Sequence, residues 1–157
     1  MNELVNTDNK FSLVPSTGAD IIARASHKGE EAETLIKALK ELFPETQLPL
    51  RHFQCTGLYA REMFAPAGTL IVGKIHLHDS ISFLLHGEAV IFSSGLGTQR
   101  FIAPATIMAP AGTRRVIVAA TDILFTAVLA TNETDIEVIE STHAVDSLSE
   151  LINLLEK

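Results

Sequence analysis

The chain has 157 residues and a formal net charge of −7, a length that fits one domain and a charge that argues against a general nucleic-acid binder. Hydrophobic residues make up 46% and charged residues 20%, so the chain can bury a core and is not disordered throughout. One cysteine, Cys55, excludes an internal disulfide and fits a reducing compartment. No apolar run reaches the roughly 18 residues of a membrane-spanning helix, and the N-terminus does not resemble a signal peptide. We therefore expect a cytoplasmic protein that is not secreted and binds neither membranes nor nucleic acid.

The N-terminal segment, residues 1–50, is predicted to be an arm that carries one amphipathic helix. Residues 1–26 show no sustained period and are expected to form an irregular or partly ordered segment. Between Gly29 and Phe43 the apolar residues recur at helical spacing, with acidic residues in the first turn and lysines later. Pro44 is expected to end this helix, which should pack through its Leu/Ile stripe.

Residues 51–131 are typical of an all-β barrel or sandwich. Apolar and β-branched runs are interrupted every 8–12 residues by turn-forming residues. The predicted strands are Leu58–Phe64, Thr69–His76, Ser82–Leu85, Glu88–Phe92, Gln99–Ile102, Thr106–Ala109, Thr113–Ala119 and Ile123–Ala130. Ser93–Gly97 is predicted to be a hairpin loop, and His86-Gly87 a tight turn in which Gly87 adopts a positive φ.

The C-terminal segment, residues 132–157, is acidic, with one basic residue against seven acidic ones. Ser147 and Glu150 form a capping-box pattern that opens a final short helix with an apolar face. Such a helix must dock to be stable, either on the barrel or on a neighbouring subunit. Residues 51–131 are by contrast weakly basic, six against four. This pattern indicates solvated helix faces at the ends, or a basic centre that meets an anionic ligand or an acidic flank of a partner.

An internal repeat joins the two halves of the barrel region. Ala65-Pro-Ala-Gly-Thr69 recurs unchanged as Ala109-Pro-Ala-Gly-Thr113, each time before an apolar strand. Proline presets φ and glycine accepts a positive φ, so each copy predicts a turn. Two copies indicate a barrel built from two similar halves.

These motifs resemble the cupin superfamily, whose first motif has Gly, His-x-His, an acid and Gly, and whose second has Pro-x-Gly-x-x-His. The chain has Gly73-Lys-Ile-His76-Leu-His78, later Gly87, and then Pro110-Ala-Gly112-Thr-Arg-Arg115. Ser80 replaces the acid of the first motif, and Arg115 replaces the histidine of the second. The resemblance implies a single cupin-like β-barrel, a double-stranded β-helix of the jelly-roll type.

A narrower resemblance is to small cupin-like proteins that occur in bacteriophage and prophage genomes, typically without an assigned activity. It rests on Gly57-Leu-Tyr59-Ala-Arg61-Glu62, the Gly-Thr-Leu stretch at 68–70, Gly73-Lys74-Ile-His76 and Ala-Gly-Thr-Arg-Arg115. This resemblance implies a viral protein in the cytoplasm of a bacterial host. The chain departs from the group in its last strand, where further histidines and aromatic residues are missing.

The candidate site residues allow a metal centre. His76 and His78, two residues apart on a strand, point to the same face and can both ligate one divalent transition metal. A catalytic metal usually needs a third protein ligand. Asp79 has the wrong parity unless a bulge rotates it inward, and His86 is expected to reach solvent. Without a third ligand the histidines are polar residues of the barrel mouth, bonded to Ser80, Ser82 or water.

A second interpretation of the same residues is an anion site. Lys74 is expected on the strand face that carries His76 and His78, and Arg61 and Arg115 come from other strands. Guanidinium groups bind carboxylate or phosphate in bidentate fashion. A cation at position 115 disfavours a nearby metal and favours an anionic ligand. Arg61 can alternatively pair on the surface with Glu62 or Glu88.

We predict a non-enzymatic module that binds a small, anionic ligand through a degenerate metal site. Its ligand-binding residues are Lys74, His76, His78, Arg61, Arg115 and Ser80. One alternative is a metal-dependent enzyme of oxygenase or isomerase type that uses His76 and His78, and another is a structural virion or interaction protein. The cofactor is either none or one divalent metal, and the chain is expected to form a homodimer or a higher homo-oligomer.

Overall fold

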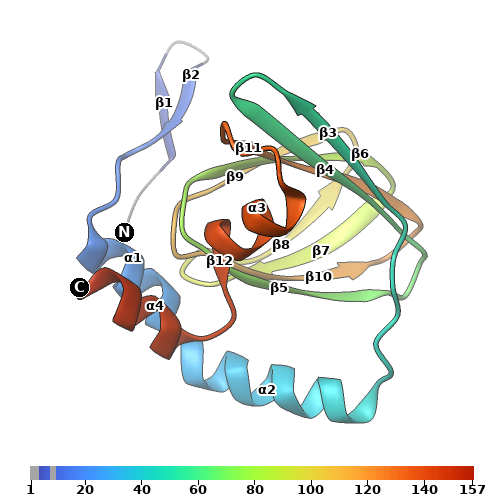
Figure 1. The fold of residues 1–157 in the computed structure, drawn as a ribbon. Coiled ribbons are helices and arrows are strands. Elements are labelled where there is room, and N and C mark those ends of the chain that lie inside the picture. Colours follow the sequence, from blue (N-terminus) through green and yellow to red (C-terminus); the bar gives the residue numbers. More distant parts are fainter. Residues whose placement is uncertain (1–3, 8–9) are drawn as a thin grey trace.

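The computed structural model describes residues 4–7 and 10–157, and at its centre two antiparallel five-stranded sheets form a barrel (Figure 1). The sheet named here the β5 sheet has the strand order β12-β5-β10-β7-β8. Its strands are β5 (Leu70–His76), β7 (Glu88–Ser93), β8 (Gly97–Ile102), β10 (Arg114–Ala119) and β12 (Ala144–Val145). The other, the β4 sheet, has the order β3-β4-β11-β6-β9. Its strands are β3 (Leu50–Cys55), β4 (Leu58–Ala65), β6 (Ser80–His86), β9 (Ala105–Ala109) and β11 (Ile123–Ala130).

The eight strands predicted from the sequence are confirmed, with shifts of only a few residues at their ends. The predicted hairpin loop joins β7 to β8, and Gly87 has a φ of 82° between β6 and β7. An alanine Cβ at Gly87 would lie 2.0 Å from the Asp122 carbonyl oxygen, so this turn requires glycine. The sequence analysis missed β3, an edge strand whose six residues are all exposed and so lack a buried face.

The barrel core lies between the two sheets and fills one end of the barrel. Alternating residues of both sheets meet there, as expected for strands with one buried face. The buried members are Ala65, Leu84, Ala89, Ile91, Ile107, Ile117, Ala119, Ile123 and Phe125. These apolar side chains leave the polar interior side chains to the other end.

The repeated Ala-Pro-Ala-Gly-Thr sequence forms two equivalent turns, which confirms the prediction of two similar halves. Gly68 and Gly112 have φ values of 84° and 87°. In each turn the threonine hydroxyl donates to the proline carbonyl at 2.7 Å. An aspartate accepts from the central alanine amide in both copies, Asp122 from Ala67 and Asp79 from Ala111. The sequence repeat is thus a structural repeat at the level of single hydrogen bonds.

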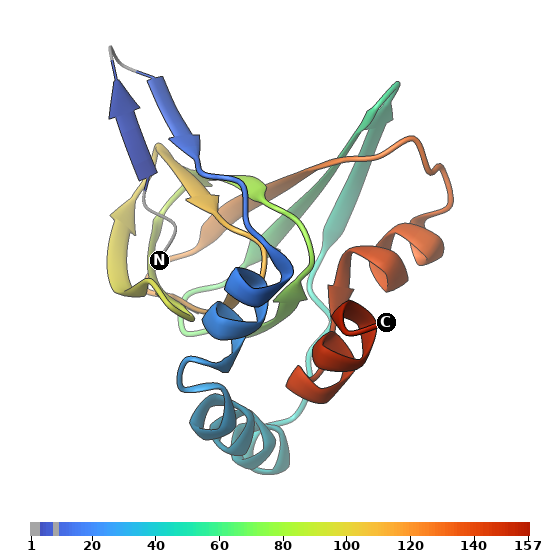
Figure 2. The ribbon, with the colours of Figure 1, turned by 90° about the vertical axis from the view of Figure 1, so that its left-hand side faces the viewer.

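The N-terminal arm, which was expected to be irregular or partly ordered up to residue 26, contains two strands and a helix in its described part. Strands β1 (Leu4–Thr7) and β2 (Lys10–Leu13) form a hairpin that projects from the body, and helix α1 (Gly18–Ser26) follows (Figure 2). Thr17 and Asp20 make the reciprocal bonds of a capping box. That four-residue pattern, Thr-Gly-Ala-Asp, was the signal for α1 in the sequence.

Helix α1 packs on the second repeated turn. The Arg24 guanidinium donates to the carbonyl oxygen of Ala111. A Cβ at Gly112 would lie 2.5 Å from the Ile21 carbonyl oxygen, so glycine is needed for this close approach as well as for its positive φ. The arm therefore covers the turn that leads into β10.

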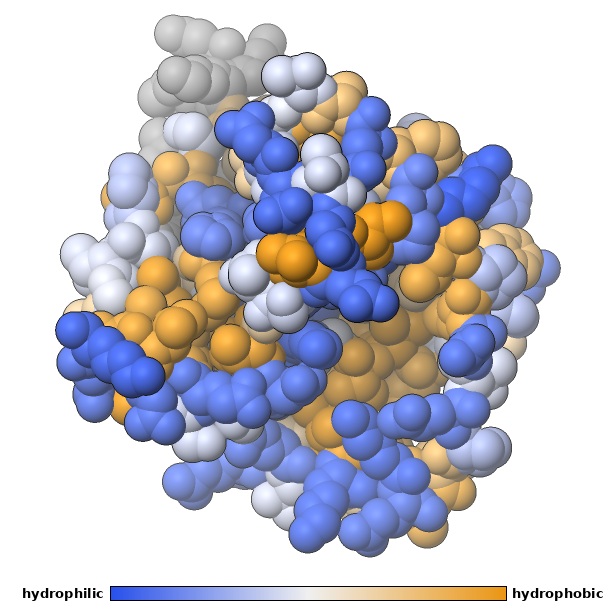
Figure 3. Space-filling view, viewed as in Figure 1, coloured by the Kyte–Doolittle hydropathy of each residue, from blue (hydrophilic) through white to orange (hydrophobic). Residues whose placement is uncertain are grey.

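Helix α2 (Gly29–Leu42) occupies the predicted range and ends before Pro44. Its apolar stripe packs only in part, because Ile36 is buried while Leu35 and Leu42 are exposed. A groove of about 740 Å³ separates the end of the helix and the segment up to Pro49 from β4 and β5. Figure 3 shows apolar surface in this region, beside the polar face of α2. The predicted packing of the stripe is confirmed for Ile36, whereas Leu35 and Leu42 remain exposed.

The C-terminal segment contains two helices where one was predicted. Helix α3 (Ile136–His143) begins at Asp135, whose carboxylate accepts from two backbone amides, and helix α4 (Leu148–Leu155) begins at Ser147 as expected. Leu151 of α4 is fully buried against Ala25 of α1 and Ile75 of β5, so α4 docks on its own barrel. None of the helices in the described ranges combines the length and the apolar character needed to cross a membrane.

Candidate functional site

Polar interior side chains gather where β5 ends and where β6 and β10 begin, here called the polar end of the barrel. His76 is the last residue of β5, Ser80 the first of β6, and Arg115 the second of β10. Ser80 and Ser82 are buried and alternate with exposed Ile81, so both hydroxyls share the interior face of β6. Helix α3 lies across this end in both views of the ribbon (Figures 1 and 2). The end of the barrel opposite the apolar core is therefore polar and covered.

Arg114 and Arg115 are consecutive and point to different environments. The pairing of β10 with β5 shifts register between Arg114 and Val116, and Gly73 lies opposite this irregularity. A Cβ at Gly73 would be 3.0 Å from the Arg115 carbonyl oxygen, so the missing side chain lets the two backbones approach. Arg114 contacts the helices outside the barrel, whereas Arg115 points to Ser82 inside it.

Arg115 is only 7% exposed, yet its hydrogen bonding is incomplete. Nη1 donates to the Ser82 hydroxyl at 3.0 Å. Arg115 Nη2 and Ser80 Oγ are both buried and have no hydrogen-bond partner among the residues that the structure describes. A buried donor without a partner costs free energy, about 1–3 kcal/mol and more when it is charged. Two such groups lie at the polar end of the barrel.

The charge of Arg115 is also uncompensated, unlike that of the two other arginines buried in the described part of the chain. Burial lowers the pKa of Arg24, but Asp20 and Asp79 oppose this effect. For Arg114 the opposing carboxylates are those of Glu33 and Asp146. For Arg115 burial alone acts, and it lowers the pKa to about 10. The guanidinium therefore stays charged at neutral pH without a carboxylate to balance it.

His76 lies next to this charge and is uncharged at neutral pH. Burial is the largest cause that lowers its pKa, to about 4, and the positive charges of Arg115 and Arg61 and the proximity of His143 add to it. A neutral imidazole offers one N–H donor and one acceptor nitrogen. At pH 7 the polar end thus carries one buried positive charge, that of Arg115.

Helix α3 brings two site residues that the sequence analysis did not single out, His143 and Glu140. His143 Nδ1 lies 3.0 Å from the Ile139 carbonyl oxygen, and its ring contacts that of His78 edge-on with centroids 5.4 Å apart. The Glu140 carboxylate pairs with Arg61 at 3.2 Å, and both side chains are partly exposed. Asp135 followed by apolar residues was an N-cap signal for this helix, but sequence spacing does not indicate that it covers the barrel.

The remaining predicted residues lie at the edges of the site. Lys74 is half-exposed and pairs with Asp146 at 3.5 Å. Arg61 pairs with Glu140 rather than with Glu62 or Glu88, which bind Arg51 and Arg100 instead. His86 is exposed, as expected. The structure thus brings His76, Ser80 and Arg115 together and places the other cations in surface ion pairs.

Tyr59 closes the β3 side of the interior. It is buried, and its hydroxyl lies 2.8 Å from His52 Nδ1 on the neighbouring strand. The two rings stack with centroids 6.0 Å apart. Burial raises the pKa of Tyr59, so the residue acts as a neutral hydrogen-bonding group. Cys55, at the end of the same edge strand, is free and exposed.

Asp79 has a structural role, because its carboxylate accepts from the Ala111 amide at 2.9 Å. Replacing Asp79 by alanine is expected to lower the free energy of unfolding by about 1–2 kcal/mol, since a buried turn amide loses a charged acceptor. Asp122→Ala, the equivalent change in the other half, removes a bond to the exposed Ala67 amide and should have a smaller effect. Urea denaturation of both variants measures the free energy of unfolding. An Asp79→Ala variant as stable as the wild type would contradict the structural role of Asp79.

The residues present do not fit a metal centre. Three imidazoles, those of His76, His78 and His143, reach the polar end. However, the residues with described positions contain no group of three or more His, Cys, Asp or Glu arranged to hold a metal ion. The buried charge of Arg115 also disfavours a dication beside His76. We therefore assign no chemical step to a metal here.

Comparison with known proteins gives structural neighbours only. No protein-family model and no curated protein matches the chain. Ectoine synthase from P. lautus has 17% identity and a TM-score of 0.53 over 66% of this chain and 78% of that one. An RmlC-like cupin with a double-stranded β-helix from Methanocaldococcus jannaschii has 11% identity and a TM-score of 0.48 over 57% and 84%. The SPY1581 protein of unknown function from Streptococcus pyogenes has 24% identity and a TM-score of 0.48 over 56% of this chain and 77% of that one.

The sheet topology, together with the likeness to ectoine synthase at a TM-score of 0.53, defines the fold class of the protein. The two antiparallel five-stranded sheets form a double-stranded β-helix, with helices added at both ends of the chain. The fold predicted from the motif spacing is confirmed. At these identities the likeness shows the fold alone, and cupin folds host many unrelated functions. The function must therefore be argued from the polar end itself.

Proposed function

We propose that this cupin barrel is a binding module for a small anion, held inside the polar end by Arg115. The observation that carries the proposal is the buried guanidinium, which among the described residues has no carboxylate partner and has one nitrogen, Nη2, without a hydrogen bond. Burying an unpaired charge is expensive, and proteins usually pair such a charge or bind an ion with it. An anion at this position would balance the charge and complete the hydrogen bonding of the arginine.

The surroundings support binding rather than catalysis. The neutral His76 and the hydroxyls of Ser80 and Ser82 are hydrogen-bonding groups. A nucleophile needs an adjacent base that is itself held in place, and Ser80 Oγ has no hydrogen bond to any described group. Helix α3 lies over the polar end, and its ion pair between Arg61 and Glu140 is partly exposed. We infer that the ligand enters on this side, past α3.

The test is a screen of anionic metabolites and nucleotides by thermal denaturation, followed by titration calorimetry on each compound that raises Tm. A ligand at 100 times its Kd stabilises the folded state by about 2.7 kcal/mol. Arg115→Gln is expected to weaken binding at least 30-fold, because a charge-assisted bond in a desolvated site is lost. Arg100→Gln, which removes an exposed arginine paired with Glu88, is the matched control and should leave affinity unchanged.

Two results would overturn the proposal. One is a complete screen in which no anion raises Tm, or equal binding by wild type and Arg115→Gln. The other is near-stoichiometric iron, zinc, manganese or nickel in the untagged protein by elemental analysis, retained until chelation. That second result would favour the alternative of a metal-dependent cupin enzyme using His76 and His78.

A further inference from the structure

The geometry of the polar end points to a class of anion, an inference that rests on the proposed function. We infer that the ligand is a small monocarboxylate whose two oxygens accept hydrogen bonds from Arg115 Nη2 and Ser80 Oγ. These are the two buried side-chain atoms of the described residues that lack a partner. They are linked through Ser82, which shares the interior face of β6 with Ser80 and accepts from Arg115 Nη1 at 3.0 Å.

The single buried positive charge at the site matches a ligand with one negative charge. Arg115 is the buried cation, and no carboxylate compensates it. The next cation, Arg61, is neutralised by Glu140 on α3, at 3.2 Å. A monocarboxylate would bring the buried charge to zero. A phosphate monoester carries about −1.5 to −2 at pH 7, which would leave excess negative charge in a desolvated place.

The number of free donors also matches a carboxylate. A phosphate group presents three strong acceptor oxygens, and phosphate sites usually add backbone amides from a glycine turn or a helix start. The glycine turn next to Arg115 has none to spare. The Ala111 amide donates to Asp79, the Gly112 amide to His76, and the Thr113 amide to Pro110. The two buried side-chain atoms without a partner, Arg115 Nη2 and Ser80 Oγ, can each donate to one carboxylate oxygen.

A small side chain lies beside Ser82. In the β4 sheet Ala127 pairs with Arg61 on one side and with Ser82 on the other. Directly opposite residues share a face of the sheet, so a methyl group lies between the serine and Arg61, whose charge is paired with Glu140. The ligand's uncharged part would meet this methyl group, and the paired Arg61 offers no free charge to a second carboxylate, which favours a short aliphatic acid over a dicarboxylate.

The experiment compares acetate, propionate, phosphate, sulfate and acetamide at pH 7, followed by ¹H–¹⁵N NMR of the whole chain. We expect saturable shifts at Ser80, Ser82 and Arg115 with acetate and propionate, and at least tenfold weaker binding of phosphate and sulfate. Acetamide, which has the shape of acetate without its charge, should not bind. Ser80→Ala should weaken acetate and propionate at least tenfold, whereas the exposed Ser149→Ala should not change their affinity.

The outcomes separate this inference from the proposed function. Binding of phosphate or sulfate at Arg115 with carboxylates excluded would overturn the monocarboxylate class and leave the anion module standing. Equal acetate affinity in Ser80→Ala and wild type would overturn the role of Ser80 Oγ. If no tested anion binds the wild type, and the spectrum of Arg115→Gln also stays unchanged under titration, both the monocarboxylate inference and the proposed anion-binding function are overturned.

Discussion

Replacing Arg114 by methionine is expected to lower the free energy of unfolding by about 3 kcal/mol, whereas the same replacement of Arg115 is expected to keep it unchanged or raise it. The two residues are adjacent, equally buried and chemically identical. Their partners differ, and the expected difference between the variants follows from the partners alone.

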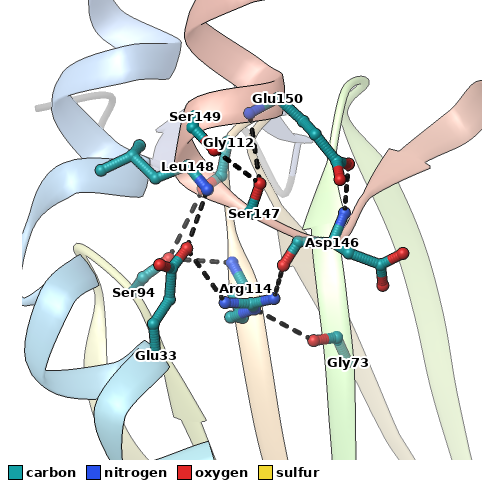
Figure 4. Close-up of polar contacts among 10 residues, drawn as sticks. All are labelled: Glu33, Gly73, Ser94, Gly112, Arg114, Asp146, Ser147, Leu148, Ser149 and Glu150. Carbon is teal, nitrogen blue, oxygen red and sulfur yellow. Dashed lines mark hydrogen bonds and ion pairs between the residues drawn. The ribbon is translucent and has the colours of Figure 1, made fainter. Parts of the chain in front are cut away.

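Arg114 joins four elements of the structure (Figure 4). Its Nε donates to the Gly73 carbonyl on β5 at 3.2 Å, and Nη2 donates to the Asp146 carbonyl before α4. Nη1 lies 3.8 Å from Glu33 Oε1 on α2, and the same oxygen accepts from the Leu148 amide at 2.8 Å. Methionine would leave these acceptors without their donor, and charged hydrogen bonds contribute about 1.5–3 kcal/mol each. Glu33 is partly exposed, so the ion pair itself adds little.

Within the part of the chain that the structure describes, Arg115 has one hydrogen bond, to Ser82, and no carboxylate partner. Replacing a buried charged group by an apolar side chain of similar volume is often neutral or stabilising, by about 1–4 kcal/mol. The Arg115→Met variant loses the bond to Ser82 but no longer buries an unpaired charge. A site that is destabilising without its ligand is common where binding is selected over stability.

Urea denaturation at pH 7 in a buffer without carboxylates or phosphate measures both variants. The urea midpoints of Arg114→Met and Arg115→Met should differ by more than the experimental error of either midpoint. The Arg115→Met midpoint should be the higher of the two. Arg100→Met, at an exposed position, is the control. Equal destabilisation by both changes would show that Arg115 already has a compensating partner and would remove the main support for an anion site.

The second large effect is a loss of stability in acid that comes from His76. Its pKa is about 4 in the folded protein and near 6.5 in the unfolded chain. Between these values the unfolded state binds a proton that the folded state does not, so stability falls as the pH falls. One pKa unit corresponds to about 1.4 kcal/mol, so His76 is expected to remove about 3 kcal/mol between pH 6.5 and pH 4.

The measurement is the free energy of unfolding at several pH values for wild type and His76→Gln. Other groups titrate in the same range, so the difference between the two proteins isolates His76. The wild type should lose about 3 kcal/mol more than the variant on going from pH 6.5 to pH 4. His86→Gln, at an exposed position, should follow the wild type. Parallel curves for wild type and His76→Gln would mean that His76 is not buried as described.

Much of the barrel was predictable because strands of this kind are encoded locally. Alternating apolar residues between glycine and proline turns gave the eight strands, and the duplicated Ala-Pro-Ala-Gly-Thr sequence gave the two halves. The elements that were missed lack this local signal. Strand β3 is exposed on all its residues, and α1 and α3 are short helices whose main signals are their caps, Thr17 and Asp135.

Some residues of the candidate site were likewise predictable from the sequence, and others were not. His76, Ser80 and Arg115 were predicted from their positions in the motifs, and the structure places all three at the polar end of the barrel. Lys74 was expected beside them, but it pairs with Asp146 next to the irregular pairing of β5 and β10. His143 and Glu140 were not found, because their approach to the barrel depends on how α3 docks.

By itself, the sequence determined the fold class, the two-fold repeat and the cation at position 115, since these depend on local pattern and on residue identity. Only the tertiary structure decided that Arg114 is saturated with partners while Arg115 is not. Burial, compensation of charge and completion of hydrogen bonds are properties of neighbours brought together from distant parts of the chain. The difference between an arginine whose hydrogen bonds are complete and one whose bonds are not therefore appears only when the barrel is closed and its helices are in place.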